Sequence, residues 1–461
     1  MAQGSVHIVP TRGFTWGVST SSYQIEGAAH EDGRASSIWD TYCRQAGRIT
    51  NGDTGDTACD HYHRYLTDIA LLSDLGVNAY RFSVSWPRVI PDGRGVPNEA
   101  GLAFYDRLID ALIGAGIEPW LCLYHWDLPQ TLQDAGGWAN RSSVDWFADY
   151  ATLIGRRFGD RVKRFATFNE PSVFSLFGYC LGGQAPGISD RPTLLQVIHH
   201  VNLAHGAAVD RLRANVAGSS IGAIHNCQPC RSVSQQPQDR KAARTLDAFW
   251  NKAFPDPQLL GRYPAPVADM IAPYQRPDDL LQISRPIDWF GLNHYSPNYV
   301  KAGTRNPLGV DFAGPPRGVP LTAMGWPIEP EAFRDTLVRV YRRYKLPIYV
   351  LENGTACHDT IDANGVVSDQ PRVDYLRAYT AAMFDGVESG ADVRGYFVWS
   401  LVDNFEWSSG YSERFGLVYV DYPTQRRIPK TSYGWYAQLV KSASKRFEFM
   451  ADRGHVARQI A

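Results

Sequence analysis

Two glutamates in this chain stand where short apolar stretches give way to turns. Glu170 lies in TFNEP, residues 167–171, and Glu352 lies in YVLENGT, residues 349–355, directly before an Asn-Gly turn pair. A pair of carboxyl groups can cleave a glycosidic bond, because one donates a proton to the departing oxygen while the other attacks the sugar carbon or activates water. Each motif alone also occurs on ordinary solvated surfaces. The prediction therefore depends on whether the rest of the chain brings the two glutamates together.

Composition narrows the classes of partner. Of the 461 residues, 44% are hydrophobic and 20% are charged, and the formal net charge is -1. These values predict a large folded core, and the lack of basic tracts argues against nucleic acid and anionic membrane surfaces as partners. Aromatic residues make up 12% of the chain, which suits stacking against sugar rings and equally suits the filling of a large core. No stretch has the length of a transmembrane helix.

The cysteines and the first residues bear on location and cofactors. Seven cysteines are scattered along the chain, and this odd number favours a reducing, cytoplasmic setting. The opening stretch MAQGSVHIVPTRGF has neither a basic start nor an apolar run, so no secretory signal is expected. Cys227 and Cys230 form one CxxC, which would need a second ligand pair or a thioredoxin-like context to bind zinc or do redox chemistry. We expect no metal and no cofactor.

Short apolar stretches alternate with amphipathic ones along the chain, a pattern typical of a parallel sheet covered by helices. Helical spacing is clearest over 61–75, which Gly76 should end, and over 331–344. Eight strands alternating with helices predict a closed (β/α)8 barrel, an α/β fold, rather than an open doubly wound sheet. No GxGxxG follows the first stretch, which argues against a dinucleotide fold. The expected strands are residues 14–20, 77–86, 117–125, 162–169, 219–226, 288–295, 347–352 and 393–401.

No linker rich in Pro, Gly or Ser divides the chain, so residues 1–461 are predicted to form one barrel domain with its core at about 14–440. Long loops are candidate walls of a substrate cleft, because the loops after the strands build the active face of a barrel. The loop 227–240 is polar and featureless, and we interpret it as a surface excursion. The other loops of this kind are 41–58, 178–192 and 300–328.

Polar and aromatic residues gather at the ends of the expected strands. Burying such groups unpaired is unfavourable, so their concentration predicts a shared site on the C-terminal rim of the barrel. His294 should point away from that rim, because neighbouring residues of a strand face opposite sides. Arg81 lies within the second expected strand, and the residues at or beyond the strand ends are Gln24, His125, Trp126, Asp127, Asn169, Glu170, Asn293, Tyr295, Glu352, Trp399, Glu406 and Trp407.

With these motifs in order, the chain resembles glycoside hydrolase family 1, the family of retaining β-glucosidases. The resemblance runs from about residue 14 to about residue 440, and so many ordered motifs make coincidence negligible. The motifs are SSYQIEG at 21–27, RFSVSWPR at 81–88, YHWDLPQ at 124–130, TFNEP at 167–171, GLNHYS at 291–296, ENG at 352–354, GYFVWSLVDNFEW at 395–407 and RFGLVYVDYPTQRRIPKTS at 414–432.

The resemblance implies roles for the two glutamates. Glu170 is expected to be the acid/base and Glu352 the nucleophile of a double displacement, which requires their carboxyl groups to lie about 5–5.5 Å apart. Arg81 should keep Glu352 ionised, and Tyr295 can hydrogen-bond the same carboxylate. The proton affinity of Glu170 should be high while Glu352 is anionic and should fall once the glycosyl bond consumes that charge.

The resemblance also implies which residues bind the sugar. Asn169 should contact the 2-hydroxyl, and Trp399 should lie beneath the ring. The full set expected to bind substrate is Gln24, His125, Trp126, Asn169, Asn293, Tyr295, Trp326, Trp399, Glu406, Trp407 and Phe415.

This chain departs from many relatives on the leaving-group side. Those relatives have Trp after NEP and His before APG, whereas this chain has Ser172 and Gln184. We expect both residues to shape the aglycone site together with Cys180 and Trp326. The departures leave the aglycone preference open.

The resemblance implies an exo-acting hydrolase of β-glucosides and short cello-oligosaccharides. A carboxylate at Glu406 would repel phosphate, which disfavours 6-phosphorylated sugars. Relatives that act on thioglucosides replace the acid/base with Gln, whereas Glu170 is retained here. β-Galactosidase or β-fucosidase activity, transglycosylation to an acceptor sugar, and a sugar-binding barrel without catalysis are the alternatives, the last opposed by the presence of both glutamates. The sequence leaves a homo-oligomer open.

Overall fold

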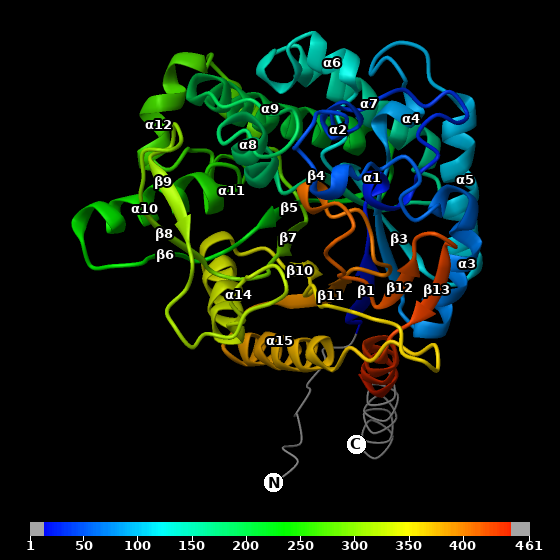
Figure 1. The fold of residues 1–461 in the computed structure, drawn as a ribbon. Coiled ribbons are helices and arrows are strands. Elements are labelled where there is room, and N and C mark those ends of the chain that lie inside the picture. The colour runs from blue at the N-terminus through cyan, green and yellow to red at the C-terminus, as the bar shows by residue number, and fades with distance from the viewer. Residues whose placement is uncertain (1–12, 444–461) are drawn as a thin grey trace, which may run out of the picture.

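The computed structural model describes residues 13–443, and within them eight parallel strands close into a barrel (Figure 1). The strands neighbour one another in the order β1-β11-β10-β7-β5-β4-β3-β2. All eight coincide with stretches expected to be strands, so the predicted (β/α)8 fold is confirmed. Their bounds are β1 Thr15–Ser19, β2 Ala79–Ser83, β3 Glu118–Tyr124, β4 Arg164–Asn169, β5 Ser220–Asn226, β7 Trp289–Asn293, β10 Ile348–Asn353 and β11 Val393–Trp399.

Helices cover the outside of the barrel (Figure 1). The longer ones are α3 His61–Leu75, α5 Glu99–Gly114, α7 Ser143–Phe158, α9 Arg191–Asn215, α10 Pro237–Asn251, α14 Pro330–Tyr344 and α15 Gln370–Glu388. The shorter ones are α1 Ser22–Ile25, α2 Ile38–Cys43, α4 Trp86–Val89, α6 Gln130–Asp134, α8 Pro171–Tyr179, α11 Pro255–Leu260, α12 Ala265–Ile271 and α13 Asp279–Ile283.

Helix α3 illustrates how the sequence pattern produces these elements. Its residues Ile69 and Leu72 are buried, as the helical spacing predicted. Gly76 ends the helix with a φ of 77°, a left-handed conformation that glycine adopts without strain. The predicted helix over 331–344 is likewise present as α14.

The last described residues pack against the barrel, where Tyr436 Oη donates a hydrogen bond of 2.9 Å to the carbonyl oxygen of Gly17 on β1. Residues 431–443 are helical. The stretch 1–12, on which the expectation of no secretory signal depends, lies outside the described residues. Among residues 13–443, no helix is both long enough and apolar enough to cross a membrane.

Aromatic side chains fill the interior of the barrel. The ring of Trp120 on β3 has its centroid 5.3 Å from that of Trp289, 4.8 Å from Tyr349 and 5.3 Å from Phe397. These four buried residues come from four different strands. The interior is therefore a packed core and not a pore, which leaves the loops beyond the strands to form a cavity.

Two small sheets lie outside the barrel. Strand β6 (Cys230–Ser232) pairs with β8 (Asn298–Ala302), which pairs with β9 (Val310–Ala313), and β12 (Val418–Asp421) pairs with β13 (Arg426–Pro429). The interpretation of 227–240 as a featureless excursion is wrong, because β6 lies within it. A strand of three residues carries too little pattern to be recognised before its distant partner β8 is known.

A buried ionic cluster fastens the last part of the chain to the barrel. Lys430 Nζ lies 2.6 Å from a carboxylate oxygen of Asp359 and 2.6 Å from one of Asp403. Arg372 pairs with Asp359 at 2.8 Å, and Arg414 pairs with Asp403 at 2.6 Å. Asp403 belongs to the segment after β11 that also carries expected site residues. The cluster therefore helps to hold that segment in place.

We expect Lys430→Met to lower the free energy of unfolding by about 3–5 kcal/mol, because it leaves two buried carboxylates without their shared cation. Urea unfolding followed by circular dichroism would measure this loss. The control is Arg377→Met, whose ion pair with Asp374 joins side chains that are 52% and 59% exposed, and which should cost less than about 1 kcal/mol. Equal, small losses in both variants would contradict a structural role for the cluster.

Candidate active site

The two glutamates emerge at the same rim of the barrel. Glu170 directly follows β4, Glu352 is the penultimate residue of β10, and both line one cavity of about 470 Å³. Glu170 has a φ of 48°, a left-handed conformation that is strained for a residue with a side chain. Pro171 opens helix α8 and disfavours the right-handed helical conformation at the residue before it. The strand-to-helix corner thus directs Glu170 toward the cavity.

Arg81 on β2 contacts two residues that line the cavity, Glu352 and Asn169. Its Nη1 lies 2.5 Å from Glu352 Oε1, and its Nη2 donates a hydrogen bond of 2.8 Å to Asn169 Oδ1. Tyr295 Oη donates to the other oxygen of Glu352, Oε2, at 2.6 Å. Burial raises the pKa of Glu352, while Arg81 and Tyr295 act in the opposite direction. Glu352 is therefore the glutamate with a fixed cation and a donor on each oxygen.

Glu170 has a different electrostatic setting. Its Oε1 accepts hydrogen bonds of 2.8 Å from Asn226 Nδ2 and of 2.8 Å from Asn293 Nδ2, and both donors are neutral. Burial, and next the charge of Glu352, raise the pKa of Glu170 to about 8. At neutral pH Glu170 therefore holds a proton beside a carboxylate that is paired with arginine. This arrangement can combine proton donation with nucleophilic attack.

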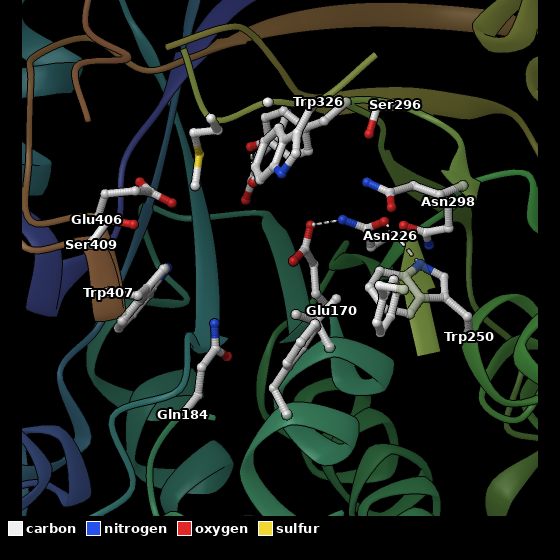
Figure 2. A pocket seen from close by; sticks show the side chains of 18 of the residues that line it. Glu170, Gln184, Asn226, Trp250, Ser296, Asn298, Trp326, Glu406, Trp407 and Ser409 are labelled. Carbon is white, nitrogen blue, oxygen red and sulfur yellow. Dashed lines mark hydrogen bonds between the residues drawn. The ribbon is translucent and has the colours of Figure 1, made fainter. Parts of the chain in front are cut away.

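Aromatic rings and one further carboxyl group form a wall of the cavity. The ring of Trp407 has its centroid 4.5 Å from that of Trp126 and 5.9 Å from that of His125. Burial, followed by the charges of Glu352 and Glu170, raises the pKa of Glu406 to about 8. Figure 2 shows Glu406 and Trp407 on one side of Glu170, with Asn226, Asn298 and Trp250 on the other. The two sides of the cavity thus differ in chemistry.

Most residues predicted from the sequence line this cavity. They are His125, Trp126, Asn169, Glu170, Tyr295, Trp326, Glu352, Trp399, Glu406, Trp407 and Phe415. Of the four residues expected to shape the aglycone site, Gln184 and Trp326 line the cavity, whereas Ser172 and Cys180 do not. Ser172 and Cys180 are instead buried in the protein. His294 is also buried and away from the cavity, with Nδ1 2.7 Å from the carbonyl oxygen of Cys227.

Two residues expected to bind substrate, Gln24 and Asn293, lie behind the cavity. Gln24 Nε2 contacts Asn404 Oδ1 at 3.0 Å, the carbonyl oxygen of Phe405 at 2.9 Å and Glu406 Oε2 at 3.3 Å. Asn293 Nδ2 donates to Asn169 Oδ1 at 3.0 Å and to Glu170 Oε1. The amide nitrogens of both residues contact acceptors of the protein, whereas Asn293 Oδ1 has no hydrogen-bond partner within residues 13–443. Both residues thus contact a glutamate of the site, Glu406 or Glu170, and their contact with substrate stays a prediction.

Several cavity residues were not predicted. Asn226 ends β5, and its place at the end of an expected strand was the signal that could have found it. Trp250 comes from α10, Phe312 comes from β9, and Gln228 lies just before β6. No local pattern distinguishes these from ordinary helix or loop residues. Among residues 13–443, no group of three or more His, Cys, Asp and Glu side chains has an arrangement that could hold a metal ion.

Known proteins share both the sequence and the fold. The pattern of Glycosyl hydrolase family 1 matches residues 8–445. The chain is 45% identical over 435 residues to Beta-glucosidase A of Thermotoga maritima. That alignment covers 93% of this chain and 97% of that protein. The chain is 43% identical over 461 residues to the Bifunctional beta-D-glucosidase/beta-D-fucosidase of Bifidobacterium breve, covering 94% and 99%. The solved Beta-glucosidase from Thermotoga maritima in complex with glucoimidazole superposes with a TM-score of 0.89 at 45% identity, covering 94% of this chain and 98% of that one.

The proximity of the two glutamates makes a prediction about their protonation. In Glu352→Gln the pKa of Glu170 should fall below about 8, because a neighbouring negative charge that favours protonation has been removed. It should stay above the ordinary glutamate range, because Glu170 remains buried. Carbon NMR of labelled glutamate carboxyl groups as a function of pH would measure the shift. An unchanged pKa would mean that the two carboxyl groups do not interact.

Proposed function

The chain belongs to glycosyl hydrolase family 1, and from this membership we propose that it is a retaining exo-β-glucosidase. It releases terminal non-reducing β-D-glucosyl residues from β-glucosides and short oligosaccharides. The observation that carries the proposal is the unequal setting of two glutamates in one cavity: Glu352 is paired with Arg81, and Glu170 has only neutral donors. A cavity of about 470 Å³ suits a small glycoside.

In the first half of the reaction Glu352 attacks the anomeric carbon while Glu170 protonates the departing oxygen. The roles follow from charge. Arg81 and Tyr295 favour the anionic form of Glu352, whereas burial and the nearby negative charge favour the protonated form of Glu170. The glycosyl group is left bonded to Glu352, and the aglycone leaves as an alcohol.

In the second half water hydrolyses this glycosyl-enzyme. The ester bond removes the negative charge of Glu352, so the pKa of Glu170 falls and its carboxylate can take a proton from water. Water attacks from the face that the aglycone has left, which restores the β configuration. One change of charge thus converts Glu170 from acid to base.

We assign the glucosyl unit to the side of the cavity that carries Glu406 and Trp407 (Figure 2). His125, Asn169 and Glu406 offer polar atoms to sugar hydroxyls, and the rings of Trp399 and Trp407 offer apolar faces. Gln24 supports Glu406 from behind, at 3.3 Å. The aglycone then occupies the opposite side.

We further propose that the enzyme works in the cytoplasm. All seven cysteines lie within the described residues, and none forms a disulfide. Cys227 and Cys230, the CxxC pair, are both free. Thiols that stay reduced are typical of a reducing compartment. Detection of a disulfide in the protein purified from its natural source without reductant would oppose this assignment.

β-Fucosidase activity is a second candidate, favoured by the name of the relative from Bifidobacterium breve. β-D-Fucose differs from β-D-galactose only by lacking the 6-hydroxyl, so a pocket that accepts the galacto configuration can accept it. We expect kcat/KM for nitrophenyl β-D-fucoside to lie within about a factor of 100 of that for nitrophenyl β-D-glucoside. Steady-state kinetics on both substrates measures the ratio, and no detectable turnover of the fucoside would remove this candidate.

Azide tests the assignment of the two glutamates. Glu352→Gly should lower turnover by at least about 10⁴-fold, and azide should restore it by attacking from the vacated face, which yields α-glucosyl azide. Glu170→Gly with a dinitrophenyl glucoside should instead yield β-glucosyl azide, because azide then attacks the glycosyl-enzyme. Proton NMR identifies the two anomers. The same anomer from both variants, or no azide product from either, would refute the assignment.

A further inference from the structure

The two carboxyl oxygens of Glu170 have different surroundings. Oε1 accepts hydrogen bonds of 2.8 Å from Asn226 Nδ2 and of 2.8 Å from Asn293 Nδ2. Within residues 13–443 no hydrogen bond from the protein reaches Oε2, and in Figure 2 this oxygen points away from Asn226 toward the open space of the cavity. Two donors occupy both lone pairs of Oε1. A proton on the neutral acid must therefore sit on Oε2.

Trp250 determines which way the amide of Asn226 faces. Its Nε1 donates a hydrogen bond of 3.1 Å to Asn226 Oδ1. An indole nitrogen can only donate, so the amide carbonyl must face Trp250 and the amide NH₂ must face Glu170. Trp250 is only 4% exposed, so water does not easily replace its indole N–H as the donor to Asn226 Oδ1. The indole thus holds Asn226 as a donor toward Oε1.

The second donor is oriented from the opposite side of the site. Arg81 Nη2 donates to Asn169 Oδ1, and a guanidinium can only donate. Asn169 therefore presents its carbonyl oxygen to Asn293 as well, and Asn293 Nδ2 bridges from that oxygen to Glu170 Oε1. Two donor-only side chains, Arg81 and Trp250, thus fix both amides around one carboxyl oxygen.

We propose that Trp250 is a positioning residue for acid catalysis: through Asn226 it saturates Glu170 Oε1 and places the catalytic proton on Oε2, where the departing oxygen can take it. This inference rests on the proposed function. Without the indole N–H, Asn226 can turn its carbonyl toward Oε1 and accept the proton of Glu170 there. The acid then carries its proton on the oxygen that faces the protein.

The test compares two β-glucosides in Trp250→Phe, which keeps an aromatic ring and removes the N–H. Methyl β-glucoside needs a proton on its leaving oxygen, whereas dinitrophenolate leaves without one. The ratio of kcat/KM for methyl glucoside to kcat/KM for dinitrophenyl glucoside should fall about tenfold. In the wild type, a Glu170 pKa of about 8 sets the alkaline limb of the kcat/KM profile. In Trp250→Phe this limb should move to higher pH, because ionised Glu170 loses a hydrogen-bond donor and protonated Glu170 gains an acceptor.

Trp120→Phe is the matched control. It removes the indole N–H that donates to Glu118 Oε2 at 2.8 Å, at the N-terminal end of β3, which is the end opposite the rim that carries the glutamates. It should leave both the ratio and the pH limb in place. Asn226→Asp is the second variant, used if Trp250→Phe does not fold. It should also lower the ratio, because its carboxylate accepts the proton from Oε1.

The outcomes separate this inference from the proposed function. A wild type that turns over neither glucoside would refute the function itself. If the wild type is active, and Trp250→Phe lowers kcat/KM equally for both substrates and leaves the alkaline limb unmoved, only the positioning role is overturned. Trp250 would then serve only in packing.

Discussion

The ion pair between Arg81 and Glu352 is the interaction on which the rest of the site depends. Arg81 is 1% exposed and can only donate hydrogen bonds, so each group it contacts must present an acceptor. Glu352 does so as a carboxylate, and Asn169 does so with its amide oxygen. A buried charge without such partners would strongly destabilise the fold. The ionisation of Glu352 and the direction of the amides around Glu170 therefore share one origin.

The barrel supplies the rigidity that this interaction requires. Trp120 and its aromatic neighbours fill the interior, so the strand ends cannot collapse inward. Trp126, Glu170 and Trp407 have φ values of 78°, 48° and 50°, left-handed conformations that are costly for such residues. The surrounding packing maintains this strain at three residues that line the cavity. The buried cluster around Lys430 secures the segment after β11.

How far the sequence could predict this site varies with the kind of signal. The barrel strands are apolar runs bounded by turns, so both their existence and the rim position of Glu170 and Glu352 were predictable. The protein partners of Gln24 and Asn293 were not predictable, because they are residues that lie far away in the chain. Trp250 gave no signal either. Its importance arises only where α10 packs beside the end of β5.

In the proposed mechanism Glu352 forms the bond to sugar, while Glu170 only moves protons. In a 2-deoxy-2-fluoro glucoside, fluorine destabilises the positive charge of both transition states and so slows both formation and hydrolysis of the glycosyl-enzyme. A dinitrophenyl leaving group speeds formation alone, so the glycosyl-enzyme accumulates. Peptide mass spectrometry of the inactivated enzyme then identifies the labelled side chain. We expect one fluoroglucosyl group, on Glu352. A label on Glu170, or on any other residue, would contradict this mechanism.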